Sequence, residues 1–131
     1  MNWDYIAGFF DGEGNLHVQQ VKPPPDKQVS ILIRIYSSQV NVLNAIKKFI
    51  GFGNLYIKKS TGVSELTIIK KEYVKNFLDN IKEKIIIKKE QVDYLLFNYN
   101  FERGSNSNFD VDKFRSFITR KNVEKFRKIS S

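Results

Sequence analysis

Cysteine is absent from this chain of 131 residues, and histidine occurs only once, at position 17. These shortages exclude a disulfide framework, a thiolate nucleophile, a cysteine-based zinc site and any metal site that needs two histidines. No run of about 18 apolar residues occurs, so we expect no segment that spans a membrane. The first residues also lack the basic start and the apolar run of a secretory signal. We therefore expect a soluble, intracellular protein.

The charge is strongly basic, because 22 Lys and Arg residues face 14 Asp and Glu residues and give a net charge of +8. A hydrophobic content of 41% and an aromatic content of 14% exclude a disordered basic tail. The length suits one compact domain over residues 1–131, with no linker that divides it. The net charge is +2 over residues 1–65 and +6 over residues 66–131. Such a surplus indicates a polyanionic partner.

The basic residues are densest in the C-terminal helical segment that we predict over residues 110–128. Glu124 is the only acidic residue between Lys113 and Lys128. The seven basic residues of this run are Lys113, Arg115, Arg120, Lys121, Lys125, Arg127 and Lys128. A run of this kind is typical either of a solvated helix face or of a surface that neutralises phosphates, and composition does not choose between the two.

Lys, Ile and Asn, with 17, 15 and 12 residues, make up a third of the chain. All three have A/T-rich codons. This bias favours a gene in an organelle, such as a mitochondrion or a chloroplast, or in an AT-rich prokaryotic or archaeal genome.

The periodicity of apolar residues predicts an α+β fold. Trp3, Ile6, Ala7 and Phe10 have helical spacing and indicate a helix over about 3–13, which Gly12 and Gly14 end. Alternating apolar residues then predict two strands, and a helix is predicted after them. Two shorter strands are expected at 54–58 and 65–69. The helices expected after these strands include residues 74–81, 92–99 and 111–118. Two hairpins would form one four-stranded antiparallel sheet with helices packed on its apolar face.

The other face of this sheet would remain exposed and polar. Its expected side chains are mostly amides, hydroxyls and cations, which are the groups that read base edges. They are Asn15, His17, Gln19, Gln28, Ser30, Arg34, Tyr36, Tyr56, Lys58 and Thr67. A merely solvated face would explain polar residues but not the shortage of carboxylates, since Asp26 is the only acidic residue between positions 15 and 64. For His17 alone, an ordinary surface histidine is the better interpretation.

The end of the first helix combines three unusual features. Gly8 and Gly12 lie four residues apart on one helix face, where each glycine costs roughly 1 kcal/mol relative to alanine. The bare face they leave allows another backbone to approach closely. Asp11 and Glu13 lie at the helix C-terminus, where the macrodipole disfavours negative charge, so a compensating cation is indicated. Taken singly, each feature also fits an ordinary glycine-rich helix end.

Together these residues resemble the signature of the LAGLIDADG homing endonucleases, which they carry in the run Tyr5-Ile6-Ala7-Gly8-Phe9-Phe10-Asp11-Gly12-Glu13-Gly14. The element order also fits the αββαββα plan of that family, and so do the segments Gln28–Gly53 and Ile87–Gln91. The resemblance thus covers nearly the whole chain. Because only one signature occurs, it is similar to the single-motif members that act as homodimers.

The resemblance implies a site-specific enzyme that cleaves double-stranded DNA at a long, roughly palindromic site. Two signature helices would pack along the dimer axis through Ala7, Gly8, Asp11 and Gly12. Glu13 would be the catalytic, metal-binding acid, a departure from the Asp of many members, and the Gly12 carbonyl would be a second ligand. Mg²⁺, with Mn²⁺ as a substitute, suits carboxylate and carbonyl ligands.

Three further residues receive catalytic roles from the resemblance. Lys88 corresponds to the basic residue near the scissile phosphate, although without the family it would be taken for a surface lysine. The family often has Gln after the second long strand. Ser37 occupies that place here and Gln39 follows two residues later. Either side chain is a candidate to position water.

Two other functions compete with this one. A family member that has lost cleavage would act as an intron-RNA splicing helper (a maturase) or as a DNA-binding regulator, and only then would RNA be a partner. Retention of Glu13 and Lys88 favours the enzyme. A basic protein of the membrane surface is disfavoured, because no Lys-rich amphipathic helix with a lipid-seeking face occurs.

Overall fold

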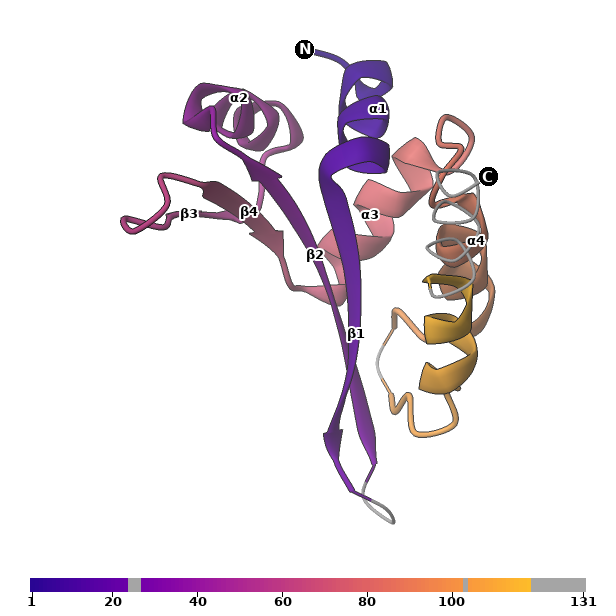
Figure 1. Ribbon diagram of the computed structural model, residues 1–131. Coiled ribbons are helices and arrows are strands. Elements are labelled where there is room, and N and C mark those ends of the chain that lie inside the picture. The colour runs from indigo at the N-terminus through magenta and orange to yellow at the C-terminus, as the bar shows by residue number, and fades with distance from the viewer. Residues whose placement is uncertain (24–26, 103, 119–131) are drawn as a thin grey trace, which may run out of the picture.

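The computed structural model describes residues 1–23, 27–102 and 104–118, and the elements alternate as the periodicity predicted (Figure 1). The chain begins with helix α1 and continues through two hairpins to helices α3 and α4, and residues 111–118 are helical as well. The elements are α1 (Trp3–Glu13), β1 (Gly14–Lys22), β2 (Gln28–Ser37), α2 (Val40–Ile50), β3 (Asn54–Ile57), β4 (Ser64–Ile68), α3 (Lys71–Ile81) and α4 (Lys89–Asn98). The α+β class, the element order and the helix over 3–13 are therefore confirmed.

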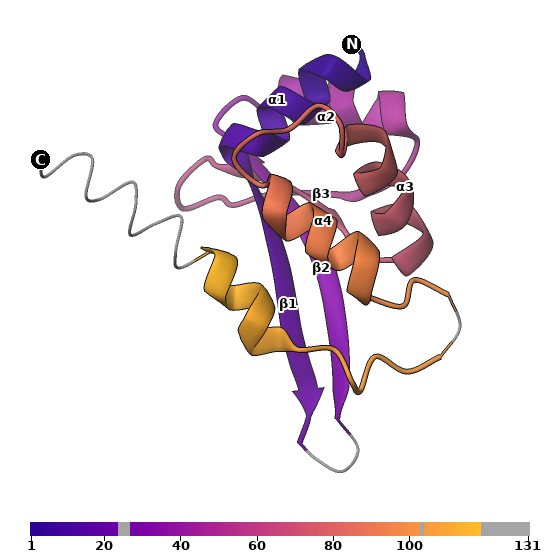
Figure 2. The same ribbon diagram turned by 90° about the vertical axis from the view of Figure 1, so that its right-hand side faces the viewer.

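The four strands form one antiparallel sheet in the order β1-β2-β4-β3. Strands β1 and β2 are much longer than the other two and extend beyond them as a twisted hairpin (Figure 2). Alternate residues of β2, from Val29 to Ile35, are buried on the side that faces the helices. This alternation is the reason why one face of the sheet can carry the core while the other remains polar.

Helices α1, α2 and α3 cover the apolar face of the sheet near its wide end. The buried stripe of α1 consists of Ile6, Ala7 and Phe10, all fully buried. Phe10 packs edge-to-face on Phe77 of α3, with ring centroids 5.4 Å apart. Burying an aromatic or aliphatic side chain of this size contributes roughly 1.5–3 kcal/mol each. Packing of α1 on this core holds its C-terminus over the start of β1.

Helix α4 and the helical residues 111–118 pack along the long hairpin (Figure 2). The buried Tyr99, directly after α4, donates its hydroxyl to the Val29 carbonyl at 2.9 Å. Lys27 donates to the Phe109 carbonyl at 3.1 Å, and Arg115 donates to the Val18 carbonyl at 3.3 Å. These bonds attach the C-terminal part of the described chain to both long strands.

The predicted basic segment over 110–128 is only partly described. Residues 111–118 form a helix, whereas the remainder of the segment, with five of its seven basic residues, lies outside the described residues. No helix within the described ranges is both long and apolar enough to cross a membrane.

Candidate active site and nucleic-acid interface

Glu13 is the last residue of α1 and lies exposed where the helix passes directly into β1. The direct passage depends on Gly14, because a Cβ at this position would overlap the Phe10 ring. Among the described residues, none forms an ion pair or a side-chain hydrogen bond with the Glu13 carboxylate. A carboxylate at the negative end of the helix dipole attracts cations. Glu13 is therefore available to bind a metal ion.

Asp11 has a different role from Glu13, although only one residue separates them. The residue is 8% exposed, and its carboxylate accepts three backbone N–H groups, from Ile86 and Ile87 at 2.8 and 2.9 Å and from Lys88 at 2.8 Å. These donors compensate the charge that the helix end disfavours. The sequence indicated a compensating cation for both acids. Because backbone N–H groups already compensate Asp11, only Glu13 still needs such a cation. The resemblance placed Asp11 at the dimer interface, but its carboxylate is occupied within its own chain.

Lys88 lies half-buried at the same helix end. Its ammonium donates to the Asp11 carbonyl at 2.7 Å and lies 5.7 Å from the centre of the Phe10 ring. The carbonyls of a helix C-terminus and the face of an aromatic ring both attract a cation. Lys88 is therefore no ordinary surface lysine. The fold bonds it to Asp11, which lies two residues before Glu13 in α1.

The glycines of the signature leave one side of α1 open. A Cβ added at Gly8 or at Gly12 would meet no atom within 4 Å. Tyr5 and Phe9 lie on the same side at helical spacing, with their rings stacked 6.0 Å apart, and Tyr5 is 48% exposed. We define Tyr5, Gly8, Phe9 and Gly12 as the open face of α1. The sequence predicted the two glycines of this face and missed the two aromatic residues.

Ala7 does not belong to the open face, and its place in a dimer interface stays a prediction. Its side chain is fully buried in the core of its own chain, next to Ile6 in the stripe that faces the sheet. The reason is the helical period, since residue 7 points away from the side on which residues 5, 8, 9 and 12 lie.

Ser37 and Gln39 lie at the junction between β2 and α2. The Ser37 hydroxyl accepts the backbone N–H of Gln39 at 2.9 Å, and Gln39 is the residue that precedes α2. Gly14, the first residue of β1, pairs with Ile35 of β2. Ser37 follows Ile35 by two residues, so it lies at the end of the sheet where α1 passes into β1. No hydrogen bond within the described residues joins either side chain to Lys88 or Glu13. Their role in positioning water stays a prediction.

One copy of the chain does not form a closed metal site. Nowhere in the described ranges do three His, Asp or Glu side chains lie close enough to hold one metal ion. Glu13 and the neighbouring Gly12 carbonyl supply oxygen donors, which are the ligands that Mg²⁺ prefers. The donor set thus fits Mg²⁺ chemically, and further ligands must come from outside this part of the chain.

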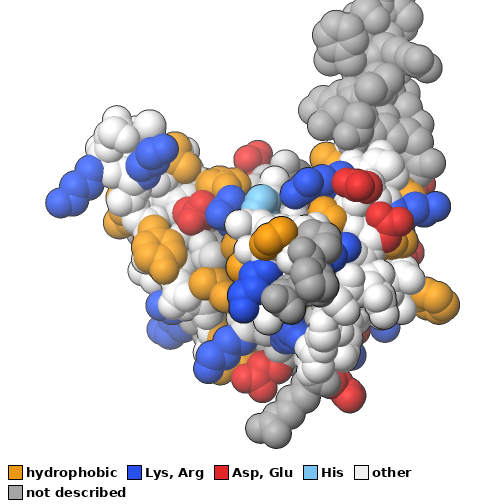
Figure 3. All heavy atoms as spheres, turned by 90° about the horizontal axis from the view of Figure 1, so that it is seen from below, with side chains coloured by type: hydrophobic (Ala, Val, Ile, Leu, Met, Phe, Trp, Pro, Cys, Tyr) orange, Lys and Arg blue, Asp and Glu red, His pale blue; other side chains and the backbone are white. Residues whose placement is uncertain are grey.

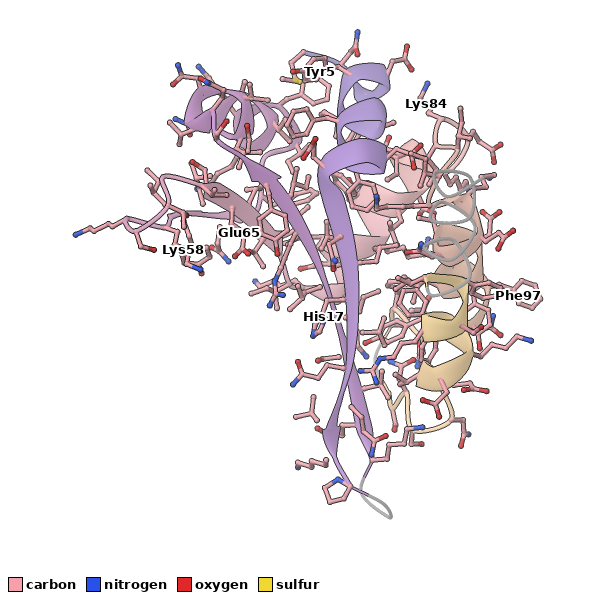
Figure 4. The ribbon with its side chains drawn as sticks, viewed as in Figure 1. Tyr5, His17, Lys58, Glu65, Lys84 and Phe97 are labelled. Atoms are coloured by element: carbon pink, nitrogen blue, oxygen red, sulfur yellow. The ribbon has the colours of Figure 1, made fainter. Side chains whose placement is uncertain are left out.

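The predicted polar residues do share one face of the sheet, as the strand register shows. Asn15 pairs with Arg34, which pairs in turn with Thr67 across β4, and Gln19 pairs with Ser30. His17 lies between these pairs, and its ring contacts the Gln19 amide at 3.2 Å. In Figure 4, His17, Glu65 and Lys58 all lie on the side of the sheet away from α3 and α4. Seen from below, His17 has Lys and Arg side chains on both sides of it (Figure 3).

Glu65 is a residue of this face that the sequence analysis missed. It lies on β4 between Tyr36 and Tyr56, just beyond the range in which carboxylates are scarce. Its carboxylate lies 3.8 Å from the Arg34 guanidinium and accepts the Thr67 hydroxyl at 3.0 Å. The sequence did contain the pattern that predicts its place. Residues two apart in a strand share a face, so the alternation that assigns Thr67 to this face assigns Glu65 to it as well.

Thr67 itself is on the predicted face but does not reach its surface. Its side chain is 5% exposed, because β4 is an inner strand and the longer side chains of Arg34 and Glu65 stand beside it. The predicted contact of Thr67 with DNA stays a prediction, for a side chain that is buried in one copy of the chain. Thr67 orients the Glu65 carboxylate through its hydroxyl.

Comparison with known proteins shows the family of this chain. The sequence model of the LAGLIDADG endonuclease family matches residues 6–101, which include α1 from Ile6 onward and Lys88. A relative in Schizosaccharomyces pombe, named as the probable intron-encoded endonuclease Cox1-I1b, is 26% identical over 125 residues. The match covers 92% of this chain but only 32% of that protein, so the chain spans about a third of the relative's length.

Solved structures share the fold. The homing endonuclease I-TnaI has a TM-score of 0.64 and 25% identity, covering 74% of this chain and 70% of that one. I-CvuI, crystallised with DNA in the presence of Mg, has a TM-score of 0.64 and 23% identity over 72% of this chain and 63% of that one. The archaeal intron-encoded I-Vdi141I, crystallised with DNA, has a TM-score of 0.59 and 19% identity, covering 92% of this chain and 96% of that one. With its signature helix, its sheet and most of its length matched by the family, this chain is a member of the LAGLIDADG homing endonucleases.

Proposed function

We propose that this protein is a site-specific endonuclease that cleaves both strands of DNA as a homodimer with a divalent metal ion. The observation that carries the proposal is the junction of α1 with the segment before α4. There the Glu13 carboxylate, unpaired among the described residues, ends the same helix to which the Lys88 ammonium is bonded through the Asp11 carbonyl, next to a polar sheet face. An acid that binds metal and a cation that meets phosphate are the two groups that phosphodiester hydrolysis needs at one place.

The open face of α1 supports the homodimer. A helix that buries one apolar stripe in its own core and exposes a second one needs a partner for the second. Without a Cβ at Gly8 and Gly12, another helix can approach this face closely. A second copy offers the same surface around a two-fold axis. Pairing through this face would place two Glu13 carboxylates near each other, so each copy would complete the metal site of the other.

Glu13 and the Gly12 carbonyl are the residues that would hold Mg²⁺, or Mn²⁺ in its place. When bound, the metal supplies a water of lowered pKa and stabilises the negative charge that develops on the phosphate. The chain's own contribution is to keep two carboxylates close in spite of their repulsion and to hold the Lys88 ammonium beside them. Ser37 and Gln39 are the candidates in this chain that orient the attacking water.

The polar sheet face would lie in the major groove, with the two faces of a dimer in successive grooves. Amides and the Arg34–Glu65 pair would read base edges, while Lys113, Arg115 and the basic residues after them would contact phosphates. A dimer that reads with two identical faces recognises a roughly palindromic site. Several phosphate contacts predict an affinity for DNA that falls steeply as the salt concentration rises.

The alternative is a member of the family that binds nucleic acid without cutting it, as an intron-RNA maturase or a DNA-binding regulator. Loss of cleavage would remove the need for an unpaired acid at the end of α1. Glu13 remains unpaired within the described residues and Lys88 remains bonded to the same helix end. These two observations favour the nuclease.

Cleavage of a plasmid that carries the intronless host-gene site tests the proposal. We expect double-strand cuts with Mg²⁺ that disappear in EDTA and in Glu13→Gln, while the gel shift of that variant persists. Glu72→Gln is a matched control, since Glu72 is also exposed but lies in the first turn of α3. Intact DNA across a randomised site library, in spite of specific binding, would exclude the nuclease in favour of the binding protein.

A further inference from the structure

A hollow of about 250 Å³ lies beside Lys88, between the start of β1 and the first turn of α4. Its wall is mixed: Leu16, Ile87 and Ile118 contribute apolar surface, and Asn15, Lys88 and Gln91 contribute polar surface. Asn15 and Gly14 line it where it approaches the end of α1, so the hollow adjoins the residues that follow Glu13. Its volume would hold several water molecules, each of which occupies roughly 30 Å³ in the liquid.

Gln91 is the polar residue that α4 contributes to this hollow. It is only 7% exposed and follows Lys88 by three residues, about one helical turn. Across the described part of the chain, no side-chain hydrogen bond reaches the Gln91 amide. In the same part, every side-chain polar atom that is fully enclosed has a hydrogen-bond partner. Within that part the Gln91 amide has no such partner, so its atoms are not fully enclosed, and the hollow that Gln91 lines is the space onto which they open. The amide is therefore buried in the protein but free to bind what the hollow contains.

A buried amide that found no partner would cost about 1–3 kcal/mol, so the Gln91 amide needs a partner from within the hollow. Leu or Met at this position would pack against Leu16, Ile87 and Ile118 and leave no amide to satisfy, so the stability of the fold does not require an amide here. A primary amide provides two donors and one acceptor and can hold water in a polar corner of a cavity. Lys88 lines the hollow as well, so the side of the hollow that holds Gln91 is polar.

We propose that Gln91 is a positioning residue that holds ordered water in this hollow and thereby fixes the orientation of the Lys88 ammonium. The water donates to Gln91 Oε1 and accepts from Lys88 Nζ, so that the ammonium is held from the hollow as well as by the Asp11 carbonyl. This role rests on the proposed nuclease function, because the oriented ammonium would act on the phosphate. It differs from the roles of Ser37 and Gln39, which belong to another element.

Three variants test the role. Gln91→Met keeps the length of the side chain and removes the amide, Gln91→Glu keeps an acceptor, and Gln20→Met makes the same change at an exposed position of β1. For Gln91→Met we expect a single-turnover cleavage rate about 10- to 100-fold lower, as is typical when a supporting partner of a functional group is removed. DNA affinity in Ca²⁺ and the melting temperature should remain unchanged or rise slightly. Gln91→Glu should recover most of the rate, and Gln20→Met should match the unmodified protein.

A second readout needs neither metal nor cleavage. In the free, metal-free protein, the side-chain amide of Gln91, identified by its absence from the NMR spectrum of Gln91→Met, should show a cross-relaxation signal with long-lived water. An undiminished rate in Gln91→Met, or a loss of rate that only follows a loss of stability or affinity, would overturn the positioning role while the nuclease function stands. If the unmodified protein cleaves no site, the nuclease function fails and the positioning role fails with it, even where the water signal is present.

Discussion

Asp11 and Lys88 bind each other twice: the Asp11 carboxylate accepts the Lys88 backbone N–H at 2.8 Å, and the Lys88 ammonium donates to the Asp11 carbonyl at 2.7 Å. The same carboxylate also accepts the N–H groups of Ile86 and Ile87. A residue of the signature helix thus determines where a segment 75 to 77 residues later in the chain must lie. The two acids of the signature therefore differ in their tasks: Asp11 holds the basic residue in place, whereas Glu13, unpaired among the described residues, is the acid that we propose to bind metal.

Asp11→Asn should destabilise the fold. The amide offers one oxygen in place of two and turns an N–H₂ group toward backbone donors, so at least one donor becomes unsatisfied. Removing charge-assisted hydrogen bonds at a buried site should lower the free energy of unfolding by about 2–4 kcal/mol. Urea unfolding followed by circular dichroism measures this change.

Glu13→Gln is the matched control, because it makes the same chemical change two residues away at an exposed position. Surface substitutions of this kind usually change stability by less than about 0.5 kcal/mol. Equal stability of Asp11→Asn and Glu13→Gln would contradict the division of tasks between the two acids.

The sequence allowed the signature, the fold and the position of Lys88 to be predicted, but not the task of Asp11. Both acids stand at the end of the same helix, and no local pattern distinguishes them. The difference arises from the backbone of residues 86–88, whose N–H groups reach Asp11 only in the folded chain, where the segment before α4 lies at the end of α1. Gln91 escaped the sequence analysis for a similar reason, since its burial depends on β1 and Ile118.

The polar sheet face was predicted more completely, because alternation along a strand fixes which side chains share a face. The register between strands, however, cannot be predicted from the sequence of one strand alone. For this reason the pairing of Arg34 with Glu65 and the burial of Thr67 became visible only in the folded sheet. Periodicity identifies the members of a face, whereas their contacts depend on the neighbouring strands.

Glu65→Gln should change the base preference of the protein more than its overall affinity. The Glu65 carboxylate restrains Arg34 at 3.8 Å and can accept from cytosine N4, whereas an amide releases the guanidinium and suits adenine. A single lost or gained base contact alters discrimination by about 1–3 kcal/mol. Selection of binding sites from a randomised DNA library, carried out with the unmodified protein and with Glu65→Gln, measures the change.

Glu83→Gln is a control for the loss of one negative charge, since Glu83 is exposed between α3 and α4. It should raise DNA affinity slightly and leave the preferred sequence unaltered. An unchanged site preference in Glu65→Gln as well would show that the Arg34–Glu65 pair does not face the bases.

Tyr99 should make the fold sensitive to alkaline pH. Burial raises the pKa of its phenol to about 12, from an ordinary value near 10. The folded state therefore retains a proton that the unfolded state loses, and stability that is complete below pH 10 should decline between about pH 10 and 12. Tyr99→Phe should be less stable at pH 7, because the Val29 carbonyl loses its donor, yet its free energy of unfolding should fall less steeply above pH 10. Urea titrations at several pH values measure both effects.

Tyr94→Phe provides a comparison, because burial and, second, the Asp110 carboxylate also raise the pKa of Tyr94. Its phenol should add a further part of the alkaline decline. A slope above pH 10 that is identical in Tyr99→Phe and the unmodified protein would mean that the Tyr99 phenol ionises as readily when folded as when unfolded.

Gly8→Leu should separate the fold of one chain from its assembly with a second. No atom lies within 4 Å of a Cβ at Gly8, and leucine is a better helix former than glycine by up to about 1 kcal/mol. The free energy of unfolding of the single chain should therefore stay equal or rise. On the open face of α1, however, the added side chain would keep a second helix from approaching. We expect sedimentation to show a species of 15.4 kDa for Gly8→Leu, whereas the unmodified protein and the control Glu72→Leu sediment as dimers. A Gly8→Leu protein that remains dimeric would place the two-fold axis away from the open face, and the two Glu13 carboxylates could then no longer share one metal centre.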